Sequence, residues 1–126
     1  MRLPDEYGLT DRVIGLAIEV HRHLGSGLLE SAYEECLCYE LATHDIEFAR
    51  QVALPVVYKG MALECGYRMD LVISRCLVIE IKAIDRLIPI HDAQLLTYLR
   101  LGGYRIGLLM NFHAILLKDG LRRLVL

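Results

Sequence analysis

The sequence predicts an α/β or α+β domain in which helices pack on a β-sheet. Apolar residues recur every three or four positions through residues 10–44, which indicates helices. Alternating and β-branched apolar residues dominate residues 51–83, and helical spacing returns once, at residues 90–101, between strand-like segments. We therefore expect the order α-α-β-β-β-β-α-β-β-β in one domain that spans residues 1–126, without repeats or linkers.

Two helices are expected first. Thr10 to Leu24 has apolar residues at helical spacing, with Thr10 as a candidate N-cap and Gly25 as the stop signal. After a glycine-rich break, Leu29 to about His44 has broad apolar coverage, which indicates a long, half-buried second helix.

The middle of the chain should form strands. A Lys59-Gly60 turn separates two segments of a predicted hairpin, Gln51–Tyr58 and Met61–Cys65. Two further strands are expected at Gly66–Ile73 and Cys76–Ala83, and the second of these is apolar enough to lie centrally in the sheet.

The C-terminal part returns to helical spacing at residues 90–101 and stops at Gly102-Gly103. Three short strands are expected after it, at residues 104–111, 114–118 and 121–126, with an Asp119-Gly120 turn before the last.

Composition excludes several classes of protein. The chain is 55% apolar, which excludes disorder, and no apolar run is long enough to cross a membrane or to serve as a signal peptide, so we expect a cytoplasmic protein. The high apolar fraction makes a homodimer plausible. Four cysteines contain no Cys-x-x-Cys pair, so free thiols are favoured over disulfides, zinc or an iron–sulfur cluster.

The net charge of −2 argues against a protein that coats DNA through its phosphates alone. The charge is unevenly distributed, however. Residues 1–63 carry five Lys and Arg against ten Asp and Glu, whereas residues 64–126 carry nine against six. This asymmetry permits nucleic-acid binding by the second half.

The residues that point to chemistry are Asp70, Glu80 and Lys82. Alternation along the strand places Glu80 and Lys82 on one face, which alone is typical of a surface ion pair. Asp70, on the preceding strand, would join them if Asp70 and Glu80 pair across a three-residue connection. Two carboxylates that meet in this way suit Mg²⁺ or Mn²⁺, and Lys82 could orient the attacking water or neutralise a phosphate.

The two predicted helices at residues 29–44 and 90–101 offer further candidates. Glu30 follows Gly27 by three residues and precedes Tyr33 by three, so it is either a third carboxylate of the site or a solvated residue at a helix N-terminus. Tyr33 is expected to pack in the core. Gln94 and Tyr98 lie one turn apart and can hold water, phosphate or a base edge, or can simply form a mixed helix face. Arg100 is a candidate for substrate phosphates.

Taken together, these motifs resemble a known family. Gly27-x-x-Glu30-x-x-Tyr33, Tyr67-Arg68-x-Asp70, Glu80-x-Lys82 and Gln94-x-x-x-Tyr98 are similar to the GxxExxY proteins of the PD-(D/E)XK nuclease superfamily. The last motif is similar to a helix of RecB- and Cas4-like exonucleases.

The resemblance implies a mixed sheet flanked by helices and a role for each matching residue. Asp70 and Glu80 would be metal ligands, Lys82 the catalytic lysine, and Glu30 the helical acidic residue of the catalytic and metal site. Gln94 and Tyr98 would support the substrate or a water.

Three functions remain open on this reading. The first is a Mg²⁺- or Mn²⁺-dependent nuclease, with DNA favoured over RNA. The second is a non-catalytic module that keeps the fold and binds nucleic acid or forms a dimer. The third is a metal-dependent hydrolase of small phosphate esters.

Overall fold

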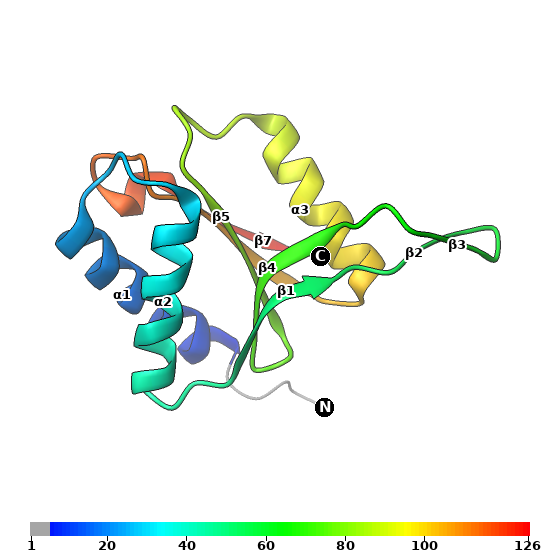
Figure 1. The fold of residues 1–126 in the computed structure, drawn as a ribbon, viewed down its shortest axis with the longest axis horizontal. Coiled ribbons are helices and arrows are strands. Elements are labelled where there is room, and N and C mark those ends of the chain that lie inside the picture. The colour runs from blue at the N-terminus through cyan, green and yellow to red at the C-terminus, as the bar shows by residue number, and fades with distance from the viewer. Residues whose placement is uncertain (1–5) are drawn as a thin grey trace.

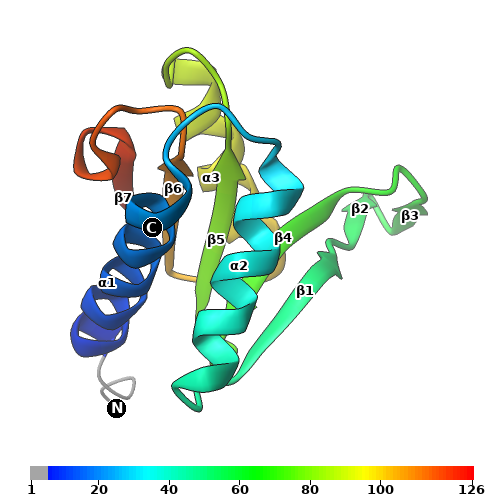
Figure 2. The ribbon, with the colours of Figure 1, turned by 60° about the vertical axis from the view of Figure 1, so that its left-hand side comes forward.

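The helices of the domain lie on both faces of one twisted sheet (Figures 1 and 2). The computed structural model describes residues 6–126. α1 (Glu6–Leu24) and α2 (Glu30–Thr43) cover one face of the sheet, and α3 (Pro89–Gly102) covers the other. This arrangement confirms the expected mixed sheet flanked by helices.

The sheet has the order β1-β4-β5-β6-β7. Its strands are β1 (Phe48–Ala53), β4 (Arg68–Ile73), β5 (Leu77–Lys82), β6 (Ile106–Asn111) and β7 (Leu121–Val125). β5 and β6 pair in parallel through the crossover helix α3, and the other neighbours are antiparallel. β5 therefore lies centrally, as its apolar sequence predicts.

Separate apolar clusters hold the two layers of helices to the sheet. The α1 and α2 face buries Val13, Ala17 and Leu37 against Ile79 and other strand residues. The α3 face buries Leu95 and Leu99 against strand residues from β4, β5 and β6. α3 approaches closely because Gly107 of β6 has no side chain, and a Cβ there would lie 3.0 Å from Leu95.

A hairpin projects from the body of the domain (Figure 1). β2 (Val56–Tyr58) pairs with β3 (Met61–Leu63) through the expected Lys59-Gly60 turn, where both residues have positive φ. The hairpin is shorter than expected, because the chain divides at Leu54-Pro55. The segment before Pro55 pairs instead with β4, so the long strand predicted at Gln51–Tyr58 is two strands.

Two other local predictions are wrong. Residues 114–118 do not form a strand, but lead through a turn into the 3₁₀ helix η1 (Leu117–Gly120). Only Leu117 of that apolar run is buried, whereas Ile115 is 88% exposed. The apolar side chains of this segment therefore do not pack together against the sheet. Thr10 does not cap α1, because the helix begins at Glu6 and Thr10 is buried within it.

None of the helices within residues 6–126 is long and apolar enough to cross a membrane. The four cysteines are free thiols, and Cys65 is exposed.

Candidate active site

Asp70 and Glu80 stand opposite each other at the junction of β4 and β5. The pairs Leu71–Ile79, Val72–Val78 and Ile73–Leu77 fix the register around a Ser74-Arg75-Cys76 connection. Ser74 and Arg75 both have positive φ, which allows the tight reversal. The register extrapolates to Asp70 opposite Glu80, which is the pairing that the sequence analysis required.

The two strands part at this pair, and the carboxylates fill the opening. The Asp70 N–H donates to Glu80 Oε1 at 3.2 Å, and the Ile81 N–H donates to Asp70 Oδ2 at 2.8 Å. Each carboxylate therefore satisfies a backbone N–H of the opposite strand. Beyond the opening, β5 continues to pair with β6 as far as Lys82.

The side chains of β1 and β4 change faces at the same place. Phe48 and Leu71 pack with α1 and α2, whereas Val52 and Met69 pack with α3. Strict alternation would keep residues 48 and 52 on one face, as it would residues 69 and 71. The change coincides with Gln51, which has a φ of 49°. At this change of face, Gln51 contacts both Asp70 and Glu34 of α2.

Burial and mutual repulsion disfavour two charges at this site. Burial, followed by the charge of Asp70, raises the pKa of Glu80 to about 8. Burial also raises the pKa of Asp70, and the charges of Glu34 and Glu30 add to that effect. Lys82 acts in the opposite direction and favours the ionised form of Glu80. The site is thus an acidic cluster that a cation would stabilise.

Glu30 reaches the same region from the first turn of α2. Its Oε2 accepts a hydrogen bond from the Ala83 N–H at 3.1 Å, directly after the end of β5. Its charge contributes to the raised pKa values of both Asp70 and Glu80. Glu30 therefore lies close enough to the cluster for its charge to act on both carboxylates.

Tyr33 explains the spacing around Glu30. It is fully buried and stacks on Phe112 at a centroid distance of 4.5 Å, so it packs in the core as expected. Its hydroxyl donates to Gly25 O at 2.6 Å and accepts from the Leu28 N–H at 3.1 Å. These bonds hold the loop before α2, in which Gly27 has a φ of 102°. Tyr33 thereby fixes the start of the helix that carries Glu30.

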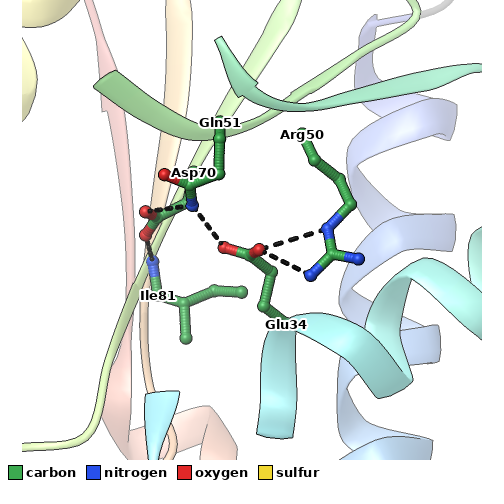
Figure 3. Close-up of polar contacts among 5 residues, drawn as sticks. All are labelled: Glu34, Arg50, Gln51, Asp70 and Ile81. Carbon is green, nitrogen blue, oxygen red and sulfur yellow. Dashed lines mark hydrogen bonds and ion pairs between the residues drawn. The ribbon is translucent and has the colours of Figure 1, made fainter. Parts of the chain in front are cut away.

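A polar network behind Asp70 was not found by sequence reasoning (Figure 3). Gln51 Nε2 donates to Glu34 Oε1 at 2.9 Å and, more weakly, to Asp70 Oδ1 at 3.4 Å. Arg50 donates to Glu34 Oε2 through Nη2 at 2.9 Å and Nε at 3.2 Å. Glu34 is only 7% exposed, so this partnership satisfies a nearly buried charge. Arg50 and Gln51 could not be recognised from the local sequence of β1, because their partners Glu34 and Asp70 come from α2 and β4.

The α3 motif approaches the carboxylates from the other face of the sheet. Gln94 Nε2 donates to the Tyr98 hydroxyl at 3.2 Å, and Tyr98 is 8% exposed. Burial is the main reason that the pKa of Tyr98 is raised, and the charges of Glu80 and Asp70 contribute. Arg100 is exposed on the same helix, and within residues 6–126 no hydrogen bond or ion pair links it to the cluster.

The donor set fits a hydrated hard cation. Asp70 and Glu80 offer carboxylate oxygens, which Mg²⁺ and Mn²⁺ prefer, and the like charges explain why a cation would be retained. No group of three His, Cys, Asp or Glu side chains in the described part of the chain is arranged to hold a metal ion. Mg²⁺ commonly uses one or two carboxylates and completes its shell with water, so the pair is sufficient.

A family model described as "PD-(D/E)XK nuclease superfamily" matches residues 7–124. The matched range includes every candidate site residue named above. No curated protein and no solved structure matches the chain.

Proposed function

Since the chain belongs to the PD-(D/E)XK nuclease superfamily, we propose that it is a metal-dependent nuclease that hydrolyses phosphodiester bonds. The observation that carries this proposal is the pair of carboxylates, Asp70 and Glu80, at the opening between β4 and β5. Lys82 lies two residues further along β5, and its charge acts on Glu80. Superfamily membership alone would not identify a competent site, because one fold can carry several functions.

Asp70 and Glu80 would hold Mg²⁺ or Mn²⁺, and Glu30 would contribute through a water or after a small movement of its side chain. When bound, the cation would polarise the phosphodiester and lower the pKa of water. The protein's own contribution is position and charge. The backbone N–H groups of Asp70 and Ile81 fix the two carboxylates, so their orientation is set before substrate binds.

Lys82 would act on the phosphate or on the attacking water. Its side chain is half-buried at the end of β5, where a cationic ammonium can neutralise charge that develops on phosphate oxygens. Gln94 and Tyr98 would hold the substrate or a water from the α3 side, and Arg100 would contact a more distant phosphate.

The decisive experiment is a cleavage assay on single-stranded, double-stranded and flap DNA, and on RNA, in Mg²⁺ or Mn²⁺. We expect cleavage that EDTA abolishes and that Asp70→Ala or Lys82→Ala reduces at least 100-fold, the usual order of loss for groups that stabilise a transition state. Lys118→Ala is the matched control, because Lys118 is exposed on η1 and lies outside the site.

Cleavage that persists in both site variants would show that the activity comes from another site or a contaminant. If the wild-type chain cleaves none of these substrates, the nuclease proposal is refuted and a binding module with the same fold is favoured. DNA as the preferred substrate, a homodimer and a cytoplasmic location also stay predictions. Comparison of DNA with RNA cleavage, analytical ultracentrifugation and cell fractionation test them.

A further inference from the structure

A cavity of about 400 Å³ lies against α3, on the α3 side of the sheet. Its walls come from α3, from Leu54 and Val56 at the base of the projecting hairpin, and from Tyr67 just before β4. Figure 1 shows the hairpin extending away from the body at this place. The volume falls in the range of about 300–1,000 Å³ typical of small-ligand pockets.

The cavity shares two residues with the candidate active site, Gln94 and Tyr98 of the α3 motif. Gln94 and Tyr98 line it, and Tyr98 is close enough to Glu80 and Asp70 for their charges to affect its ionisation. A group bound in the cavity would therefore contact the same α3 motif as a substrate held at the carboxylates. Because the α3 motif is common to both, the occupant that fits is a part of the same substrate.

The walls have the chemistry of a nucleobase site. Tyr67 is 47% exposed and meets Tyr98 edge-to-face, with a centroid distance of 6.2 Å and an angle of 62° between the rings. The exposed ring can stack on a base, while the Gln94 amide and the Thr97 hydroxyl can bind its polar edge. A larger hollow of about 670 Å³ lies beside Glu30, but its walls include no Tyr, Phe or Trp.

We propose that this cavity binds an unpaired nucleobase next to the scissile phosphate, so that the nuclease acts on single-stranded nucleic acid. In a duplex, both faces of each base are stacked and its edge is paired, so a base would have to be flipped out before it could enter. The inference rests on the proposed nuclease function, and it adds the class of substrate.

The test measures binding separately from cleavage. Fluorescence anisotropy with a labelled DNA oligonucleotide, single-stranded or annealed to its complement, is recorded with Ca²⁺ in place of Mg²⁺. The wild-type chain should bind the single strand more tightly. Tyr67→Ala should weaken that binding about tenfold, and Tyr67→Phe should retain it, because loss of a stacking ring has an effect of about this order.

Two further variants separate the cavity from general damage to the fold. Ala93→Leu/Thr97→Leu fills the cavity with good helix formers and leaves Tyr67 in place, so it should weaken single-strand binding as well. Tyr39→Ala removes a tyrosine that is 70% exposed on α2 and should leave binding unchanged. Circular dichroism confirms that each variant is folded.

Equal affinity for both DNA forms, or unchanged binding by Tyr67→Ala and by the filled variant, would overturn the inference. The proposed function is refuted by a different measurement, the cleavage assay, if the wild-type chain shows no cleavage in Mg²⁺ or Mn²⁺. Single-strand binding that depends on Tyr67 without any cleavage would support the base site and refute the nuclease.

Discussion

Replacing Glu80 with Gln tests the electrostatic account of the site. The carboxyl group has a pKa of about 8 in the folded protein, against 4.5 for an unperturbed glutamate. The folded chain therefore holds this proton more tightly than the unfolded chain. The resulting stability is fully present below about pH 4.5 and is lost as the pH rises through about 8.

The size of the effect follows from this difference. One pH unit in pKa corresponds to about 1.4 kcal/mol. Relative to its value below pH 4.5, the free energy of unfolding is therefore lowered by about 3 kcal/mol at pH 7, where the unfolded chain has lost the Glu80 proton and the folded chain still holds it, and by about 5 kcal/mol above pH 9, where both have lost it. Both figures are a large part of the roughly 5–15 kcal/mol that stabilises a typical domain. Gln cannot ionise, and its amide oxygen can still accept from the Asp70 N–H.

The assay is urea unfolding in EDTA at about pH 5, 7 and 9. We expect Glu80→Gln to be more stable than the wild-type chain by an amount that grows with pH, while its nuclease activity is lost. Glu64→Gln, at an exposed glutamate, is the control and should follow the wild type. Mg²⁺ should stabilise the wild type above pH 7 more than it stabilises Glu80→Gln, because the ion binds the ionised carboxylate.

Parallel stability curves for wild type and Glu80→Gln would refute the reasoning, since they would mean that burial of Glu80 has no net cost. A stabilisation by Mg²⁺ that is the same in both proteins would place the ion elsewhere.

Three other predictions concern the scaffold. Tyr33→Phe should lower the free energy of unfolding by about 1–2 kcal/mol, because two backbone groups of the loop before α2 lose their partner; unchanged urea denaturation would contradict this role. Gly107→Ala should cost about 1–3 kcal/mol by the same measurement, since the new Cβ would lie 3.0 Å from Leu95, and a neutral effect would mean that α3 yields easily. Burial raises the pKa of Cys38 to about 11, so mass spectrometry after alkylation of the native protein at pH 8 should find exposed Cys65 modified well before it. Equal labelling rates would show that the interior around Cys38 opens readily.

The helices and strands whose apolar residues recur at a regular spacing were predictable from the sequence. The central position of β5 follows from its continuous apolar run, and α2 and α3 lie within a few residues of their expected bounds. The 114–118 segment was not predictable in this way. Its apolar residues suggest a strand, but only pairing and burial in the folded chain decide whether such a run joins a sheet.

The sequence by itself determined which groups could do the chemistry. Asp70, Glu80 and Lys82 stand out because charged side chains are rare in apolar strands. Helical spacing offered Glu30, Gln94 and Tyr98 as further candidates, and the resemblance of the motifs gave each of them a role. The sequence also indicated the pairing register that Asp70 needs to meet Glu80, because side chains alternate between the two faces of a strand and the register therefore decides which residues share a face.

Only the tertiary structure decided what surrounds those groups. The opening between β4 and β5, the support of Asp70 by Gln51 and Glu34, and the cavity beside Tyr67 each join residues from separate elements. No local pattern encodes such contacts, because a side chain's hydrogen bonds, desolvation and neighbouring charges depend on what folding brings beside it. The raised pKa of Glu80 is the clearest case: the residue is visible in the sequence, but the burial that raises its pKa exists only in the folded chain.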